Sequence, residues 1–255
     1  MIANYHTHTP LCRHAQGAEE EYVENAIARG LQIFGFSDHT PHWFPGDYYS
    51  KIRMLPEQLT NYCQAVHILQ EKYSSQLEIR LGMEVEYYPA TWQSLLPHLQ
   101  DAGVEYMLLG QHWNGNEFDS PHNFKPTEDT AQLIQYCNQV ITAMETGKFT
   151  YCAHPDYIYF TGDRKTYETN MRRICKASLE TDTPLEINFA GLRGSRHYPS
   201  SLFWSLAAEE GCKVVLGIDA HDPSHILDEN TERAAMDMVN TLCLNLQHTV
   251  PLKSI

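Results

Sequence analysis

Short apolar runs alternate with segments of helical periodicity along the sequence, and this alternation restricts the fold more than any other feature. Parallel strands joined by crossover helices produce this order. We therefore predict an α/β fold built from about seven strand–helix units. The candidate strands cover residues 2–8, 33–39, 77–86, 106–112, 150–154, 185–189 and 214–219.

Helices are predicted in the segments between these strands. In the segment 56–73, apolar side chains recur every three or four residues and form one face. Gly30, Gly147 and Gly211 follow three of the helical segments, as is typical of helix C-termini. The length of 255 residues and the 42% hydrophobic content suit one large core. The clearest helical segments are 19–29, 56–73, 127–146, 199–210 and 231–246.

The charge balance argues against polyanionic partners. The net charge is −14 with histidines neutral, and such a surface repels nucleic acid polymers and anionic membranes. No apolar run approaches the ~20 residues that span a bilayer, and no signal peptide is evident. The seven cysteines are scattered without a CxxC pair, which favours free thiols. We expect a cytoplasmic protein that binds neither nucleic acid polymers nor membranes.

Almost every candidate strand ends in a side chain that can bind a metal ion. In "NYHTHTPLCRHA", His6 and His8 are two residues apart, so both point to one face of a strand. In "GMEVEYY", Glu84 and Glu86 share a face in the same way. The strand at 185–189 offers only the neutral Asn188. The remaining candidates at or just after strand ends are His14, His39, His112, His154, Asp219 and His221.

These side chains are expected to meet, because reactive groups collect beyond the carboxyl ends of strands in barrels and open α/β sheets. A single histidine at such a position is more often hydrogen-bonded or solvated than a metal ligand. Several imidazoles and two carboxylates, however, are costly to crowd together without a cation. A mixed nitrogen and oxygen set suits divalent transition metals. The combination predicts a multi-metal site.

Seven motifs resemble, in order, those of the PHP (polymerase and histidinol phosphatase) superfamily, and most of all its histidinol-phosphate phosphatase branch. They are "HTHTPLCRHA", "FSDH", "GMEVEYYP", "GQHW", "AHPD", "EINFAGLRG" and "GIDAHDP". The resemblance covers nearly the whole chain. It implies a distorted (β/α)7 TIM-like barrel and a single metallohydrolase domain over residues 1–255. It also implies three divalent ions (zinc, iron or manganese) at the carboxyl ends of the strands.

The resemblance further implies how the ligands divide among the ions. One ion would take His6, His8, Glu84 and Asp219. A second would take His14, His39 and His221. A third would take His112, His154 and again Glu84, which would bridge two ions. Glu86 stays open between a direct ligand, a partner of a neighbouring group and a salt-bridge partner. We expect His42, His122 and His225 to be surface loop residues.

The activity implied by the resemblance is hydrolysis of L-histidinol phosphate to L-histidinol and phosphate, in histidine biosynthesis. We expect a metal-bound hydroxide to attack phosphorus in line, with Glu84, Asp219 and His221 at the reaction centre. A phosphomonoester also needs cationic donors, and arginine forks match its oxygens. The loop "GLRGSRHYPS" supplies Arg193, the closer match to the family's phosphate-binding arginine, and Arg196. Asn188 is the further candidate for substrate binding.

Two alternatives remain open at this point. A phosphatase or phosphodiesterase of the same superfamily, acting on another small phosphoester or nucleotide, would share the fold and the ions. A non-catalytic metal-binding regulatory module would share them too, although a degenerate domain should have lost some ligand positions. After "AHPD", the basic residue usual in the family is delayed to Arg164, which leaves the second phosphate anchor open.

Overall fold

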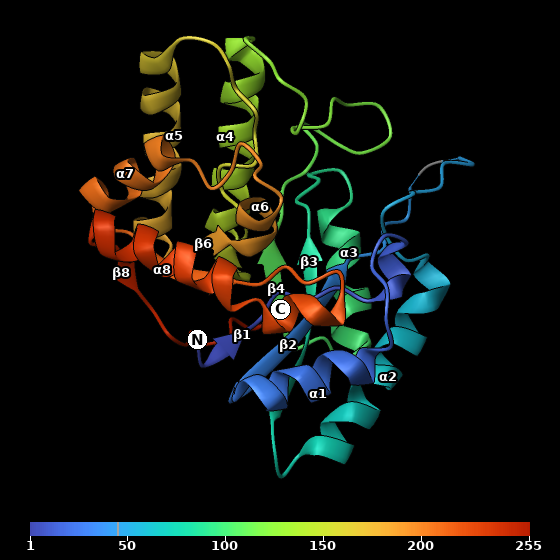
Figure 1. Cartoon of the computed structure of the whole chain (residues 1–255). Coiled ribbons are helices and arrows are strands. Elements are labelled where there is room, and N and C mark those ends of the chain that lie inside the picture. The colour runs from blue at the N-terminus through green and yellow to red at the C-terminus, as the bar shows by residue number, and fades with distance from the viewer. Residues whose placement is uncertain (45) are drawn as a thin grey trace.

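The computed structural model describes residues 1–44 and 46–255, which form a curled parallel sheet with helices around it (Figure 1). Over these residues the sheet has eight strands in sequence order, and each strand pairs in parallel with the next. The strands are β1 (Ala3–Asn4), β2 (Ile33–His39), β3 (Glu78–Val85), β4 (Tyr106–Leu109), β5 (Phe149–Cys152), β6 (Leu185–Asn188), β7 (Lys213–Gly217) and β8 (Asn245–Leu246).

The sheet curls until the segments that follow β1 and β7 meet. Thr7 and Ala220 form a parallel bridge, and the backbone N–H of His8 donates to the carbonyl of Ala220 at 2.9 Å. The short β8 pairs with Lys213 and Val214, at the opposite end of β7. The predicted distorted TIM-like barrel is therefore confirmed, with its closure at the carboxyl ends of the strands.

Helices connect the strands and cover the outer face of the sheet. Several begin with the side chain of a capping residue that accepts a backbone N–H, such as Asp129, Asp163 and Ser200. The helices are α1 (Glu19–Arg29), α2 (Leu59–Tyr73), α3 (Trp92–Asp101), α4 (Thr130–Glu145), α5 (Arg164–Glu180), α6 (Phe189–Arg193), α7 (Ser201–Glu210) and α8 (Glu229–Leu242), with short 3₁₀ turns at Pro10–Cys12, Pro56–Gln58 and Pro223–Leu227.

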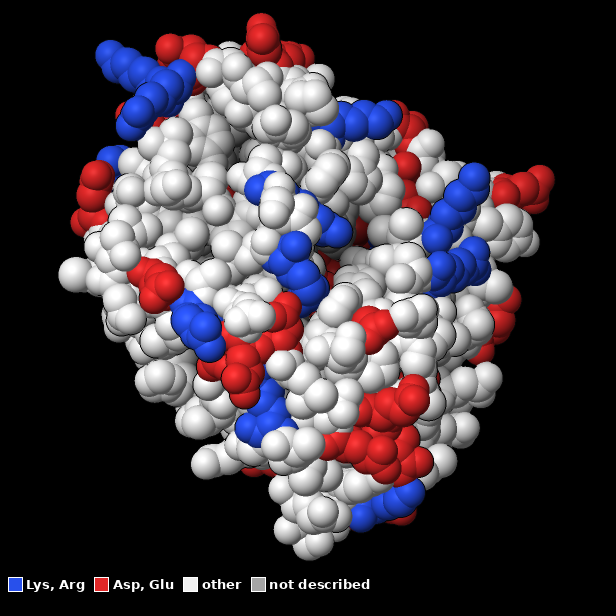
Figure 2. Space-filling view, viewed as in Figure 1, with Lys and Arg blue, Asp and Glu red and all other residues white. Residues whose placement is uncertain are grey.

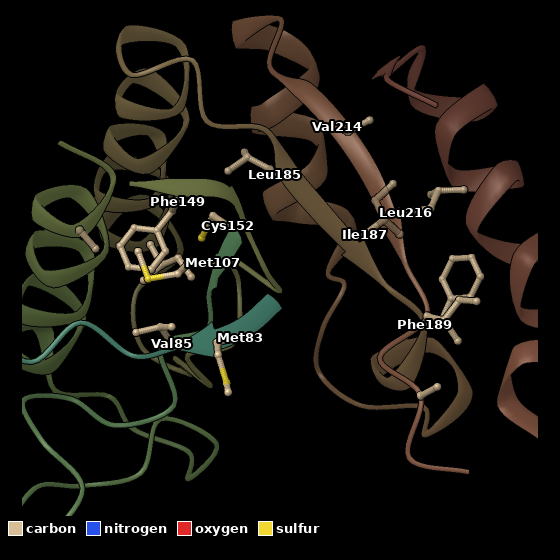
Figure 3. Packing of buried hydrophobic residues seen from close by; sticks show 14 of the residues in the cluster. Met83, Val85, Met107, Phe149, Cys152, Leu185, Ile187, Phe189, Val214 and Leu216 are labelled. Atoms are coloured by element: carbon tan, nitrogen blue, oxygen red, sulfur yellow. The ribbon is translucent and has the colours of Figure 1, made fainter. Parts of the chain in front are cut away.

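Apolar side chains pack against both faces of the sheet. The larger cluster lies between strands and helices, and Figure 3 shows Val85, Met107 and Phe149 of neighbouring strands close together within it. A smaller cluster fills the barrel interior around Tyr106 and Tyr151. The hydroxyl of Tyr106 donates to the carbonyl of Tyr5 at 2.7 Å, which ties the interior to the first strand segment.

The predicted elements differ from the observed ones mainly at their ends. The last helix was predicted to run to residue 246 but stops at Leu242, because Cys243 takes a left-handed conformation (φ 51°) and the chain then enters β8. Only Ala3–Asn4 of the predicted first strand lies in the ladder. Helices α3 and α5 had not been singled out; α5 opens with the charged and polar run Arg164–Glu168, which obscures its apolar stripe.

Charged side chains are interspersed on the face seen in Figure 2, where basic groups also lie beside a hollow near its centre. Within the part of the chain that the structure describes, no helix combines the length and apolar character needed to cross a membrane.

Candidate metal centre

A pocket of about 420 Å³ opens at the carboxyl ends of the strands. Its wall is polar and rich in histidine, and it gathers residues from nearly the whole length of the chain. The described residues that line it are His14, His39, Ile52, Glu84, His112, His122, His154, Tyr157, Ala190, Arg193, Gly194, Arg196, Tyr198, Asp219, His221 and His225.

Glu84, near the end of β3, lies at the centre of the predicted ligands. One carboxylate oxygen, Oε1, is 2.8 Å from His154 Nε2 and 3.4 Å from His112 Nε2. The other, Oε2, is 2.9 Å from His39 Nδ1. Oε2 also lies 3.6 and 3.5 Å from the Nε2 atoms of the two histidines that follow β1, His6 and His8. Five imidazoles thus face one buried carboxylate, from both of its oxygens.

Asp219, just after β7, brings the second predicted carboxylate to the same place. Its Oδ1 is 3.1 Å from His8 Nε2 and 3.6 Å from His6 Nε2. Its Oδ2 accepts a hydrogen bond from the Asn188 side-chain amide at 3.0 Å. Since Oδ2 is held from behind, Oδ1 is directed at the histidine pair.

A third group of ring nitrogens forms nearer the pocket mouth. His14 Nε2 and His221 Nε2 are 2.9 Å apart, and these atoms cluster with a ring nitrogen of His39 within 4.8 Å. The 2.7 Å contact from His14 Nδ1 to the Cys12 carbonyl places the proton on Nδ1, so Nε2 presents its lone pair. Seven of the nine predicted ligands therefore line the pocket, and the other two, His6 and His8, are fully buried against Glu84 and Asp219.

Buried carboxylates behind the site orient three of the imidazoles. His6 Nδ1 is 2.8 Å from Glu186 Oε2, and His112 Nδ1 is 2.8 Å from Glu86 Oε1. His8 Nδ1 is 3.4 Å from Asp38 Oδ1. Such contacts fix the ring and leave the opposite nitrogen for a metal ion. Glu86, whose role the sequence left open, thus contacts His112 at Nδ1, the nitrogen opposite the one that faces Glu84.

Glu186 is not among the predicted site residues, although its position carries a signal in the sequence. Glu186 lies two residues before Asn188 on β6, so both side chains point to the same face. It is completely buried, and a charged residue inside an apolar strand is rare unless it is paired. Its second oxygen, Oε1, accepts from the Asn188 amide at 2.6 Å.

The charges of the site favour a cation. Burial by itself would raise the pKa of Glu84, but the neighbouring imidazoles, His112 first, hold the pKa well below its ordinary value. Asp219 behaves in the same way beside His6 and His8. Burial lowers the pKa of His39 to about 3, so this ring is neutral. Anionic carboxylates and neutral imidazoles are the forms that bind metal ions. Despite burial, the nearby carboxylates raise the pKa values of His6, His8 and His112, so an ion would displace protons from these rings.

Several buried polar atoms support the same conclusion. Asp219 Oδ1 and His39 Nδ1 are buried and close to ligand candidates, but among the described residues neither makes a hydrogen bond of acceptable geometry. Buried polar atoms without partners are costly and call for an explanation. The close approach of His6 Nε2 to His8 Nε2, at 3.2 Å, is of the same kind. A set of nitrogen and oxygen donors that converge without satisfying one another fits bound transition-metal ions.

The local backbone makes room for these side chains. A Cβ atom on Gly110 would lie 1.9 Å from Glu84 Oε1, and one on Gly217 would lie 2.2 Å from Glu186 Oε2. Two of the ligand candidates also have unusual backbone geometry, since φ is 30° at His154 and 48° at Asp219. Strained positions of this kind cluster at functional sites.

Both predicted arginines line the pocket, whereas Asn188 is not among the described lining residues. Arg193 donates from Nη2 to the carbonyl of Asp219 at 3.3 Å, and its buried Nη1 has no hydrogen-bond partner in the described chain. Arg196 donates from Nη1 to the Tyr198 hydroxyl at 2.7 Å. The Asn188 amide is occupied by Glu186, Asp219 and the backbone N–H of Gly191, so it positions other groups.

Three histidines expected in surface loops lie elsewhere. His42 is only 4% exposed and packs against the Tyr88 ring, with centroids 4.8 Å apart. His122 and His225 are partly buried and line the pocket. The loops after the strands fold back over the site, which a single sequence does not reveal.

Comparisons with known proteins agree with this geometry. A family model for the PHP domain matches residues 4–190. A protein described as a probable histidinol-phosphatase of Deinococcus radiodurans is 30% identical over 231 residues, which cover 88% of each chain. A protein of the same description from Schizosaccharomyces pombe is 26% identical and covers 96% of this chain and 89% of the relative.

Solved structures share the fold. The histidinol phosphate phosphatase of Lactococcus lactis, determined in complex with zinc, L-histidinol and phosphate, superposes with a TM-score of 0.74. It is 18% identical, over 98% of this chain and 96% of that chain. The putative histidinol phosphatase of Listeria monocytogenes gives a TM-score of 0.73 at 21% identity, over 90% and 99% of the two chains.

Proposed function

This chain belongs to the PHP domain family, and from that premise we propose that it is a metal-dependent histidinol-phosphate phosphatase. The reaction is hydrolysis of L-histidinol phosphate to L-histidinol and phosphate. The observation that carries the proposal is the convergence of two buried carboxylates and seven histidines at the carboxyl ends of the strands, where two arginines line the same pocket as most of these side chains. Relatives aligned over most of their length are described as histidinol-phosphatases.

The donor set supports three divalent ions, of zinc, iron or manganese. His6, His8, Glu84 and Asp219 would hold the first, His14, His39 and His221 the second, and Glu84, His112 and His154 the third. Bound ions of this kind lower the pKa of water and neutralise phosphoryl oxygens. Glu84, Asp219 and His221 would act at the reaction centre by holding this charge in place. The proposal takes residues 1–255 as one metallohydrolase domain, since Asp219 and His221 lie beyond the matched segment.

Arg193 and Arg196 would bind the phosphate of the substrate. Nη1 of Arg193 makes no hydrogen bond and lies 3.9 Å from Asp228 Oδ2, so it is available for a phosphate oxygen, while Nη2 donates to the backbone at Asp219. Tyr198 holds the guanidinium of Arg196 in the pocket wall. Charge-assisted hydrogen bonds from guanidinium groups are strong and match the tetrahedral oxygens. Asn188, instead of touching substrate, would keep Asp219 oriented.

The test is release of phosphate by the purified, metal-loaded protein. We expect hydrolysis of L-histidinol phosphate, little cleavage of bis-p-nitrophenyl phosphate, and loss of activity after chelation that added zinc or manganese restores. Preferential cleavage of the diester would instead assign a phosphodiesterase. A metal-loaded protein that hydrolyses no phosphoester would refute the enzyme proposal and favour a regulatory metal-binding module.

A further inference from the structure

Arg53 is a buried arginine that the proposed reaction does not use. It lies between β2 and α2 and is 1% exposed. Its Nε donates to Glu117 Oε2 at 2.7 Å, and its Nη2 donates to Glu86 Oε1 at 2.8 Å. Its Nη1 donates to the backbone carbonyl of Thr40 at 2.9 Å. All three nitrogens are therefore engaged, and the guanidinium is fixed between two carboxylates.

The same oxygen of Glu86 faces His112. Glu86 Oε1 is 2.8 Å from His112 Nδ1, and a carboxylate can only accept, so the proton of the ring is on Nδ1. The opposite nitrogen, Nε2, then carries a lone pair and lies 3.4 Å from Glu84 Oε1. The contact behind His112 thus fixes the orientation of the ring and leaves Nε2, without a proton, toward the pocket.

This arrangement differs from the two others behind the site. Glu186 is balanced by the neutral amide of Asn188, and Asp38 accepts from the backbone N–H groups of Thr9 and His39. Among these three carboxylates, Glu86 is the one that the structure pairs with an arginine. Buried carboxylates require such compensation. Arg53 Nη1 also lies 2.7 Å from Glu86 Oε2, so the guanidinium contacts both oxygens and fixes the plane of the carboxylate.

We propose that Arg53 is a positioning residue for the ion held by Glu84, His112 and His154. Through Glu86 it fixes the orientation and tautomer of His112. Through Glu117 it ties the loop after β4 to the same point, and Tyr48, which lies in the same loop as Arg53, donates its hydroxyl to Glu117 Oε1 at 3.0 Å. The proposal rests on the proposed function only in treating His112 as a ligand.

The Glu86→Met variant tests the tautomer directly. Methionine keeps the length of the side chain and removes the oxygen that accepts from both Arg53 Nη2 and His112 Nδ1. The carboxylate that remains near the ring is then Glu84, so the proton would shift toward Nε2, the nitrogen that lies 3.4 Å from Glu84 Oε1. ¹⁵N NMR of the imidazoles in the metal-free protein reports this exchange, with the His112 signals assigned by their loss in His112→Gln.

Arg53→Met and Arg53→Lys test the source of the effect, with Arg80→Met as the matched control. Arg80 also pairs with two glutamates, Glu78 and Glu105, but it is partly exposed. We expect Arg53→Met to bind one ion about 10- to 100-fold more weakly while the others stay bound. Arg53→Lys should recover part of this affinity, because it keeps the charge and loses the fork. Arg80→Met should bind metal like the unaltered chain.

Two results would overturn the proposal. One is an unchanged His112 tautomer in Glu86→Met, together with full metal affinity in Arg53→Met. The other is equal loss of all ions, or loss of the folded state, in both Arg53 variants, which would show that Arg53 supports the barrel and not one ligand. Metal binding and NMR need no substrate. Failure of the chain to hydrolyse L-histidinol phosphate would therefore refute the proposed function and leave this inference standing.

Discussion

Replacing Glu84 by glutamine removes one negative charge from the point where five imidazoles meet, and we expect metal binding and activity to fall together. The variant keeps the size of the side chain and one neutral oxygen ligand. What it loses is the electrostatic attraction between the carboxylate and the ions on its two oxygens, which lie 2.8 Å from His154 Nε2 and 2.9 Å from His39 Nδ1.

The size of the effect follows from these short contacts. Two unit charges about 4 Å apart attract by about 4 kcal/mol at an effective dielectric constant of about 20, and a divalent ion doubles this value. The amide oxygen replaces part of the loss. If half remains, each neighbouring ion is bound about 4 kcal/mol more weakly, which corresponds to roughly 1,000-fold in affinity.

The assay measures bound metal by mass spectrometry after dialysis against a weak chelator, alongside phosphate release. Glu78→Gln is the matched control, because Glu78 lies on the same strand but is exposed at its other end. We expect the control to retain its metal. Normal metal content and normal turnover in Glu84→Gln would refute the bridging role of this carboxylate.

Three further outcomes are expected. Arg193→Ala should lower kcat/KM by about 10- to 100-fold without changing metal content, because a hydrogen bond to a charged group contributes about 1.5–3 kcal/mol. The matched control is Arg164→Ala at an exposed position, which should leave kcat/KM unchanged. Equal kinetics in the two variants would remove Arg193 from the phosphate site. Burial and nearby Arg53 lower the pKa of His42 to about 3, so only the unfolded chain binds a proton at this position as the pH falls below about 6.5, and the free energy of unfolding decreases. His42→Phe should remove about 2 kcal/mol of the stability loss between pH 7 and pH 5. Urea unfolding of the metal-free proteins measures this, and the same loss of stability in both would contradict the prediction. Despite burial, Asp219 and Asp38 raise the pKa of His8, which follows β1, to about 9. Calorimetry at pH 8 in buffers of different ionisation enthalpy should therefore show proton release on metal binding, and binding heats that do not depend on the buffer would exclude it.

The sequence predicted the chemistry at strand ends better than the groups behind it. The two-residue period of a strand predicted that His6 and His8 share a face, and the Nε2 atoms of both do face Asp219 Oδ1, although neither residue lies in β1 itself. The order of strands and helices predicted the parallel sheet. Glu186 follows the same period, but its role depends on β6 lying opposite the segment after β1, a contact 180 residues apart in sequence. Arg53 carried no signal, because its partners come from two other loops.

Helix ends show a similar division. Gly30 and Gly211 end α1 and α7 in left-handed conformations as expected, because the requirement for glycine there is local. The end of α8 depends instead on Cys243, a residue type with no preference for this conformation, and on the pairing of β8 with β7. Tertiary contacts decided this boundary, so no local pattern could have placed it.

The bridge between Thr7 and Ala220 closes the barrel at the junction of its first and last segments. Few backbone bonds cross this junction, but the ligand candidates lie on both sides of it, with His8 facing Asp219 and His14 facing His221. Ions bound there would link the first and last segments of the barrel across this junction. Opening of this junction would then require release of the metal, so free metal ions would stabilise the closed barrel by mass action.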